Sequence, residues 1–347
     1  MLFFGIAALI WGLGRALRWS AGTVWGAIGG LYVAVLLVLA TLPADSVLRV
    51  AIGGELRWWL LFGGVVGVVL AYRAGLRWLR ARAQLPDAGA EEAPLFSETE
   101  LNRYARHIVL RELGGPGQKR LKEARVLVIG AGGLGSPVLL YLAAAGVGTI
   151  GVVDDDVVDN SNLQRQVIHR DADIGIPKAQ SATAAMRAQN PHVAVKPYTR
   201  RLRADEAELL FAEYDVIIDG TDNFDTRYAV NRAAVATGKP LISGALSQWE
   251  GQLSVFDPAC GAPCYRCVFP EAPAAGLAPS CSEAGVVGPL PGVIGTMMAM
   301  EAIKLIARTG HVLRGEMVIW DGLWGESRKI RVKRRADCPD CGHVDEG

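Results

Sequence analysis

The segment at residues 125–135 constrains the fold of this chain more than any other. It reads RVLVIGAGGLG, a short apolar strand followed by Gly130-x-Gly132-x-x-Gly135. Glycines at this spacing let the backbone turn sharply and approach a phosphate, with the N-terminus of a helix behind it. The segment therefore predicts a nucleotide site in an α/β sheet. It leaves open whether the nucleotide is a redox cofactor or a substrate.

Strand and helix patterns alternate after this motif. The apolar strands are predicted at 125–129, 149–153, 193–198, 215–219 and 241–243, with helices at 136–145, 178–189 and 226–237. This alternation favours a Rossmann-like, mostly parallel sheet. A second group of strands at 251–256, 316–320 and 327–332 surrounds a helix at 293–307 and predicts a C-terminal antiparallel extension.

Two uncharged apolar runs near the N-terminus predict a membrane-anchoring region within residues 1–82. Residues 22–42 are long enough to cross a bilayer. The uncharged run at 60–72 is short alone, but it becomes a plausible span at 56–72 if Arg57 extends to the interface. Arg15 precedes the first run and Arg73 follows the second, which places both flanks in the cytoplasm. Residues 1–14 are expected to form an interfacial helix or a third span.

The alternatives for this region are a cleaved signal peptide and a buried core hairpin. The arginine flanks argue against both, because a signal peptide carries its positive charge before the apolar stretch. We therefore expect the α/β domain to be held in the cytoplasm by an inner or plasma membrane anchor. Residues 83–97, rich in Ala, Pro, Asp and Glu, are predicted to be a linker. Ser97-x-x-Glu100 is a capping box that begins a helix through Leu110 and opens the domain at 98–347.

Charged side chains follow the predicted strands, where the carboxyl edge of a parallel sheet gathers them. Asp154 ends the second strand and is placed to hydrogen-bond a ribose hydroxyl, as in an NAD-dependent oxidoreductase. Arg165 and Lys178 then add more cations than a dinucleotide pyrophosphate needs, whereas a triphosphate losing pyrophosphate requires them. Asp222 is placed to hold Mg²⁺. Each residue alone is more often a solvated group or a helix cap, but together they favour a nucleotide consumed as a substrate.

The cysteines provide a second signal. Cys264-x-x-Cys267 and Cys338-x-x-Cys341 have the spacing of two zinc knuckles, and the fold must bring them together. Disulfides are the alternative, which a cytoplasmic location disfavours. Cys281 stands apart, in a Gly/Pro-rich segment expected to be a crossover loop.

These motifs together resemble the ThiF/MoeB/HesA family, the bacterial relatives of ubiquitin-activating enzymes. The resemblance covers residues 97–343 in family order. It rests on RYARHIVL at 103–110, GAGGLGSPVLLYLAAAGVG at 130–148, DNSNLQRQVIH at 159–169, GIPKAQSA at 175–182, GTDNFDTRYAVN at 220–231, EGQLSVF at 250–256, PCYRC at 263–267 and PGVIGTMMAMEAIKL at 291–305. The N-terminal apolar region lies outside it.

The resemblance implies ATP-dependent adenylation of the C-terminal glycine of a ubiquitin-like sulfur-carrier protein, with release of pyrophosphate. The MoeB-like form of this reaction serves molybdenum cofactor biosynthesis, and the ThiF-like form serves the thiazole pathway of thiamine. Carried over by position, the nucleotide, phosphate and magnesium contacts would be Gly130, Gly132, Gly133, Gly135, Asp154 at the ribose, Asn162, Arg165, Lys178, Asp222 at magnesium, and Asn223.

The resemblance also bears on partners. Arg106 matches an arginine that reaches into the ATP site of a partner subunit, which implies a homodimer. Cys281 matches a position where some members form a thioester or persulfide with the carrier, although a bystander thiol fits the sequence equally well. No rhodanese-like extension follows Cys341, so sulfur transfer is expected from a separate sulfurtransferase.

Three further alternatives stay open at this point. They are a tRNA-modifying family member that adenylates a small carboxylate, an NAD-dependent oxidoreductase, and a membrane-anchored scaffold without turnover. A nucleic-acid partner is not expected, because the formal net charge is only +1.

Overall fold

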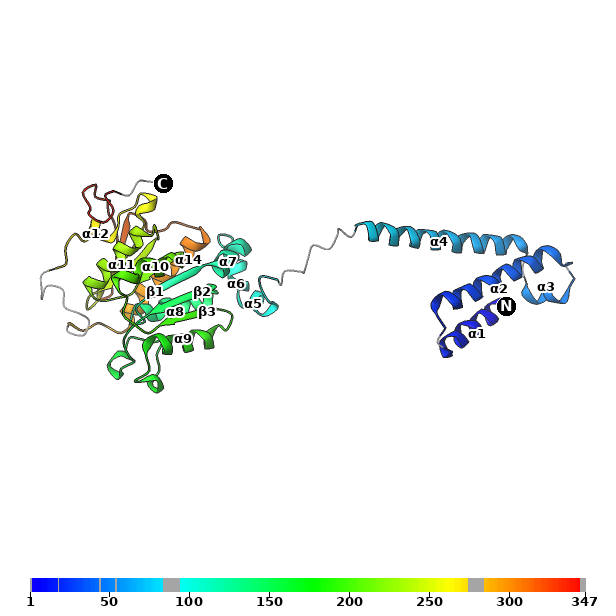
Figure 1. Cartoon of the computed structure of the whole chain (residues 1–347), viewed down its shortest axis with the longest axis horizontal. Helices are drawn as coiled ribbons and strands as arrows, with labels where there is room; N and C mark the ends of the chain where they lie inside the picture. The colour runs from blue at the N-terminus through cyan, green and yellow to red at the C-terminus, as the bar shows by residue number, and fades with distance from the viewer. Residues whose placement is uncertain are drawn as a thin grey trace. The chain divides into compact units, whose positions relative to one another are not determined.

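A computed structural model of the chain describes residues 2–17, 19–43, 45–53, 55–83, 94–273 and 284–343. The chain divides into two compact units, Met1–Ala93 and Pro94–Gly347. The described part of the first unit is helical, whereas the second is built around a sheet (Figure 1).

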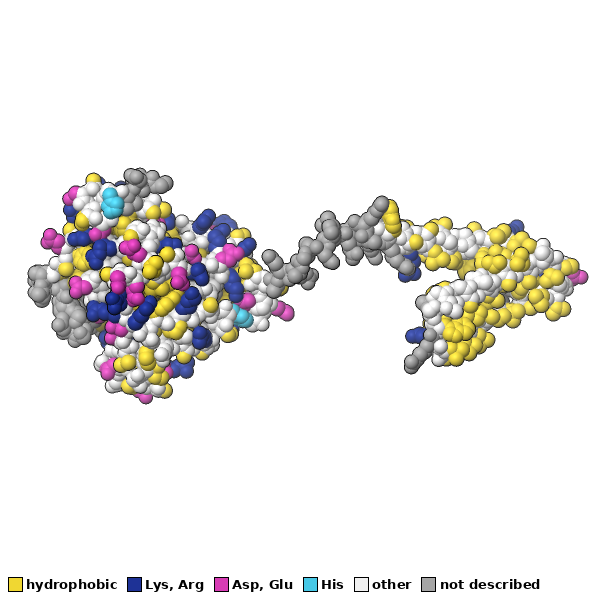
Figure 2. Space-filling model, viewed as in Figure 1, with side chains coloured by type: hydrophobic (Ala, Val, Ile, Leu, Met, Phe, Trp, Pro, Cys, Tyr) yellow, Lys and Arg dark blue, Asp and Glu magenta, His cyan; other side chains and the backbone are white. Residues whose placement is uncertain are grey.

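Four apolar helices make up the described part of the first unit: α1 (Leu2–Ala16), α2 (Ala21–Thr41), α3 (Val47–Ile52) and α4 (Leu56–Ala83). They enclose a small core in which Phe3, Leu39 and Ile52 are buried. The indole Nε1 of Trp59 donates a hydrogen bond to the Gly53 carbonyl at 3.0 Å, which ties the start of α4 to the end of α3. Apolar side chains also cover much of the outer surface of this unit (Figure 2).

Among the described residues, three helices are long and apolar enough to cross a membrane: Gly22–Thr41 in α2, Leu56–Leu76 in α4, and α14 (Pro289–Ala307) of the second unit. Burial separates them, because 56% of the α14 window is buried inside the protein, against 17% for α2 and 0% for α4. The protein core therefore accounts for the apolar character of α14. The apolar faces of α2 and α4 lack such cover, and these helices are the candidates for the predicted spans.

The described part of the second unit contains one eight-stranded sheet in the order β3-β2-β1-β4-β5-β6-β7-β8. The strands are β1 (Arg125–Ile129), β2 (Thr149–Val153), β3 (Ala194–Tyr198), β4 (Val216–Asp219), β5 (Leu241–Leu246), β6 (Glu250–Phe256), β7 (Glu316–Asp321) and β8 (Glu326–Arg331). The first five pair in parallel and the last three pair antiparallel, which confirms the predicted sheet type. The chain leaves β1 toward β2 and β3 and returns to β4 on the other side, so the topological switch lies between β1 and β4.

Helices cover both faces of this sheet. One face carries α7 (Gly114–Glu123), α8 (Gly135–Ala145), α9 (Lys178–Gln189) and α14, and the other carries α10 (Ala204–Ala212), α11 (Phe224–Ala236) and the short α12 (Tyr265–Val268). Successive β1 residues alternate between the two cores: Val126 and Val128 face one, and Leu127 faces the other. Because both faces are covered, the strand is apolar after Arg125, from Val126 to Ile129, as a buried parallel strand should be.

Local differences from the sequence predictions have physical causes. The single helix predicted from Ser97 to Leu110 is instead α5 (Glu98–Arg103) and α6 (Ala105–Ile108), interrupted at Tyr104. The Tyr104 ring is buried and its hydroxyl accepts a hydrogen bond from Asn190, so tertiary packing breaks the helix. The capping box itself is present. Helix α7 was not predicted because its first turn contains three glycines and a proline, which are typical of a loop.

Candidate nucleotide site

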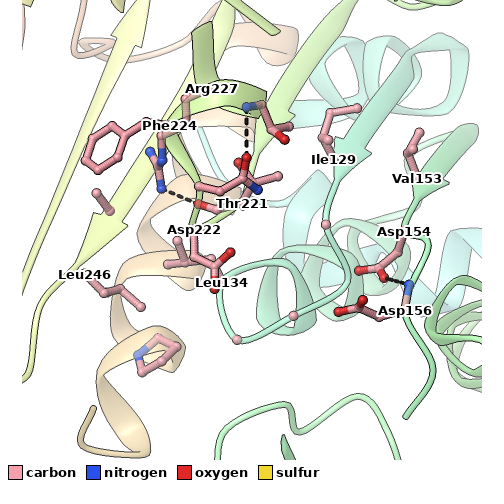
Figure 3. Close-up of a pocket in the computed structure, with 18 of the residues that line it drawn as sticks. Ile129, Leu134, Val153, Asp154, Asp156, Thr221, Asp222, Phe224, Arg227 and Leu246 are labelled. Carbon is pink, nitrogen blue, oxygen red and sulfur yellow. Dashed lines mark hydrogen bonds between the residues drawn. The ribbon is translucent and has the colours of Figure 1, made fainter. Parts of the chain in front are cut away.

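A cavity of about 620 Å³ lies at the carboxyl ends of β1, β2 and β4, where the strand order reverses. This is where ligands bind in open α/β sheets. The glycine loop after β1 separates two groups of carboxylates, with Asp222 on one side and Asp154 and Asp156 on the other (Figure 3). Of the predicted nucleotide-site residues, eight line the cavity: Gly130, Gly132, Gly133, Asp154, Arg165, Lys178, Asp222 and Asn223.

Close packing explains why the loop requires its glycines. Gly130 has φ +93°, a conformation that L side chains rarely adopt, and its amide donates to the Val153 carbonyl at 2.8 Å. A Cβ at Gly135 would lie 1.9 Å from the Gly130 carbonyl oxygen. Gly135 therefore does not line the cavity but lets the start of α8 close against the strand. Gly133 and Pro291 of α14 both line the cavity, and a Cβ at Gly133 would lie 3.1 Å from the Pro291 Cβ.

Two side chains, the half-buried Asp154 and the buried His169, hold the middle of the glycine loop. Asp154 accepts a hydrogen bond from the Ala131 amide at 2.7 Å and another from the Asp156 amide at 2.9 Å. Burial raises the pKa of Asp154, and these amides act in the opposite direction. The His169 Nε2 lies 2.9 Å from the Ala131 carbonyl, and burial lowers the pKa of this ring. The neutral ring must carry its proton on Nε2, since a carbonyl only accepts. Sequence reasoning missed His169, although it ends a quoted motif.

Some cationic side chains of the site already contact other groups of the protein. Lys178, in the first turn of α9, is buried and its Nζ lies 2.8 Å from Asp156, a partner that the sequence did not suggest. Arg165 is half-buried and donates to the Ser161 carbonyl at 3.1 Å. Arg200 and Arg201 also line the cavity and were not predicted, because they follow the edge strand β3 rather than a recognisable motif. A bound polyphosphate would therefore meet several positive groups.

Asp222 has an exposed carboxylate at the cavity wall, and no hydrogen bond or ion pair engages it among the described residues. A carboxylate beside a polyphosphate suits Mg²⁺, which takes one or two protein oxygens and completes its shell with water and phosphate. Carboxylates of Asp154, Asp155 and Asp156 also lie within 4.8 Å of one another. Backbone amides and Lys178 already engage two of these, so Asp222 fits the ion better. Asn223 caps α11 by accepting from the Thr226 amide at 2.9 Å.

A buried ion pair lies next to the loop that carries Asp222, and it was not predicted. Arg227 of α11 faces Asp219 at the end of β4 at 3.8 Å, and the two side chains are 6% and 1% exposed. Arg227 also donates to the carbonyl of Thr221 (Figure 3). It donates to the carbonyl of Gly244 as well, at 2.8 Å. The loop that carries Asp222 is therefore hydrogen-bonded to α11.

The four knuckle cysteines meet in a buried cluster. Their sulfur atoms all lie within 4.8 Å of one another, with Cys264 3.6 Å from Cys338 and Cys267 3.3 Å from Cys341. These separations exceed the ~2 Å of a disulfide and approach the roughly 3.8 Å expected between sulfurs around a tetrahedral Zn²⁺. The Arg335 amide also points at the Cys267 sulfur, at 3.4 Å. The donor set thus fits a structural zinc ion.

Besides Gly135, three residues predicted for the nucleotide or the reaction lie outside the cavity or outside the described residues. Asn162 does not line the cavity, but its carbonyl accepts from the amides of Arg165 and Gln166 and so supports the turn that presents Arg165. Arg106 is exposed on α6 and does not line its own chain's cavity. Cys281 falls within 274–283, outside the residues that the structure describes.

Comparisons with known proteins decide the family. Residues 104–340 match the ThiF family. The chain belongs to the ThiF family. It is 49% identical over 251 residues to the sulfur carrier protein adenylyltransferase of Thermus thermophilus, a match that covers 71% of this chain and 93% of the relative. It is 52% identical over 252 residues to the probable adenylyltransferase/sulfurtransferase MoeZ of Mycobacterium tuberculosis, covering 72% of this chain and 64% of MoeZ.

The family resemblance read from the sequence is confirmed by these relatives, as is the prediction of an adenylyltransferase. The mouse adenylyltransferase and sulfurtransferase MOCS3 is 49% identical over 248 residues, but this ThiF chain spans only 54% of it. Among solved structures, Escherichia coli MccB with ATP shares 22% identity at a TM-score of 0.61, over 70% of this chain and 75% of MccB. At this identity the likeness shows the fold alone.

Proposed function

We propose that this ThiF-family chain adenylates the C-terminal glycine of a ubiquitin-like sulfur-carrier protein with ATP. The observation that carries the proposal is one cavity that combines a glycine loop, a half-buried aspartate for the ribose, cationic side chains and a free carboxylate for Mg²⁺. Relatives named for sulfur-carrier adenylation support the protein substrate. A nicotinamide cofactor would leave Asp222 and the extra cations without a role.

The chemistry needs alignment and charge more than a general base. The carrier's C-terminal carboxylate is ionised at neutral pH and attacks the α-phosphorus of ATP. A new carboxylate–phosphorus bond forms, the bond from the α-phosphorus to the bridging oxygen breaks, and pyrophosphate leaves with that electron pair. Arg165 and Lys178 stabilise the charge that develops on the phosphates. Asp222 would hold Mg²⁺, which neutralises phosphate charge when bound.

The test is carrier-dependent exchange of labelled pyrophosphate into ATP. Asp222→Ala is expected to lower exchange by at least about a hundredfold, as loss of a transition-state charge contact does. Asp225→Ala is the matched control, because Asp225 is an exposed aspartate three residues away that does not line the cavity. Near-normal exchange in Asp222→Ala would remove Asp222 from the mechanism.

We assign the carrier to molybdenum cofactor biosynthesis, with a MoaD-like protein as substrate. The thiazole-pathway carrier of thiamine biosynthesis is the alternative, since the site residues serve either. Exchange measured with each purified carrier separates them, and a clear preference for the thiazole carrier would reverse the assignment.

If Cys281 carries a thioester or persulfide, Cys281→Ser will block sulfur transfer while adenylation continues. A separate sulfurtransferase would supply the sulfur.

We also propose a homodimer in which Arg106 of one copy completes the site of the other. Its exposure away from its own cavity supports this arrangement. Mixing inactive Arg106→Ala and Asp222→Ala proteins should restore about a quarter of the wild-type activity, because half of the randomly formed dimers have one intact site. Absence of recovery after proven subunit exchange would refute a shared site.

The first unit is proposed to anchor the enzyme in the inner or plasma membrane, with the catalytic unit in the cytoplasm. The exposed apolar surfaces of α2 and α4 support this proposal. Full-length protein should sediment with membranes and resist carbonate extraction. Its recovery in the high-speed supernatant would contradict the anchor.

A further inference from the structure

The four-cysteine cluster and the loop that carries Asp222 are joined by one helix. Helix α11 begins at the Asn223 cap, next to Asp222, and its Val235 packs against the cysteine cluster. Arg227 and Asn231 are four residues apart, on one face of this helix. Arg227 bonds to the Thr221 carbonyl, directly before Asp222. Asn231 is 1% exposed, and its side chain hydrogen-bonds to residues inside the cysteine knuckles.

Asn231 connects to both cysteine knuckles with its one side chain. Its Oδ1 accepts from the amide of Tyr265, which lies inside Cys264-x-x-Cys267, at 2.8 Å. Its Nδ2 donates at 2.7 Å to Asp340, which lies inside Cys338-x-x-Cys341. The Asp340 side chain is 4% exposed, and its other oxygen accepts from Arg266 of the first knuckle at 3.0 Å.

Tyr265 extends the same connection into the cavity. It follows Cys264 in sequence and it lines the nucleotide cavity. Its ring packs against Phe269, another lining residue, with 4.8 Å between ring centres. Tyr228 of α11 donates to the Phe269 carbonyl at 2.9 Å. A shift of the knuckles would therefore move a cavity wall and α11 together.

We propose that Asn231 is a positioning residue that couples the metal-binding cysteines to the nucleotide site. Metal binding holds the two knuckles in place, Asn231 holds α11 against them, and α11 sets the position of the Asp222 loop. Neither Asn231 nor Asp340 lines the cavity, so both act through other residues. The inference rests on ATP binding under the proposed function but not on the identity of the carrier.

Coupling between two binding sites is reciprocal, and this gives a readout apart from activity. If the bound metal stabilises the nucleotide site, ATP must slow the loss of the metal. The experiment uses the full chain loaded with zinc, a chromogenic zinc chelator, and Mg²⁺ in both arms, with and without ATP. We expect ATP to slow zinc release at least about fivefold, the lower end of typical coupling between sites.

Variants identify the residue that carries the coupling. Asn231→Asp places a carboxylate against Asp340 and should abolish the protection by ATP, with a rise in the KM for ATP larger than any fall in kcat. Combining it with Asp340→Asn restores complementary donors and acceptors, so the doubly substituted protein should recover the protection. This rescue separates positioning from a general loss of stability.

Asp337→Asn is the matched control for Asp340→Asn, because Asp337 lies in the same segment but its side chain is 75% exposed and pairs with Arg335. It should leave the protection unchanged. Equal protection by ATP in wild type and Asn231→Asp, or none in wild type although ATP binds, would overturn the inference without affecting the adenylation proposal. Failure of ATP to bind wild type would instead count against the proposed function.

Discussion

Replacing Arg227 with methionine gives a sharp test of how the Asp222 loop is supported. Methionine keeps much of the apolar stem but removes the guanidinium. Asp219 would then be left 1% exposed without its cation, and the Thr221 and Gly244 carbonyls would each lose a donor. Removing one partner of a buried ion pair costs about 3–5 kcal/mol of unfolding free energy.

The surroundings of Asp219 place the cost near the lower end of that range. Its carboxylate still accepts from the Thr221 amide at 3.0 Å, the Thr221 hydroxyl at 2.6 Å and the Ser243 hydroxyl at 3.1 Å. These bonds solvate the charge in part. We therefore expect a loss of about 3 kcal/mol, a large share of the 5–15 kcal/mol that stabilises a typical domain.

The assay is urea unfolding of residues 94–347, followed by far-ultraviolet circular dichroism, for the single variants and their combination. Asp219→Asn removes the charge that Arg227→Met leaves without a cationic partner. The double variant should therefore lose less stability than the sum of the two single losses. Strict additivity, or a loss below about 1 kcal/mol for Arg227→Met, would show that the pair does not support the loop.

Three other predictions follow from contacts in the second unit. Burial raises the pKa of Glu100, but hydrogen bonds, led by that from Lys122, outweigh it and lower the pKa to about 2. The contribution of Glu100 to the free energy of unfolding should therefore be complete above pH 4.5 and fall as the pH drops toward 2, by at most about 3 kcal/mol. Glu100→Gln should remove this dependence in acid titrations followed by circular dichroism. Gly135→Ala should weaken ATP binding at least about tenfold in calorimetry, since its methyl would overlap the Gly130 carbonyl. Cys264→Ser should lose bound zinc in elemental analysis and lower the melting temperature, because structural zinc stabilises the fold it closes.

Much of the sheet was predictable from sequence because its strands are buried on both faces. β1 and β2 have the predicted bounds, since each is an apolar run bounded by polar or glycine residues. The interrupted helix at Tyr104 and the unexpected α7 were not predictable. In both cases tertiary contacts override local preference: Tyr104 bonds to Asn190, and glycine-rich α7 buries Leu121.

The same distinction applies to the nucleotide site: some of its features were predictable from the sequence and others were not. The sequence alone placed its glycines, Asp154 and Asp222 at the ends of strands, because residues that follow parallel strands meet at one edge. It also paired the cysteines into knuckles, because metal ligands at this spacing form a recognisable local unit.

Only the tertiary structure paired Lys178 with Asp156 and buried Arg227 against Asp219. Such partners lie 22 and 8 residues apart in the chain, and no spacing rule connects them. The tertiary structure also places Asn231 between the two knuckles. Local sequence determined which chemical groups this protein has and where along each strand they lie. Side-chain contacts between elements decided which of these groups are free to act and which are held in place, because such contacts depend on how the elements pack.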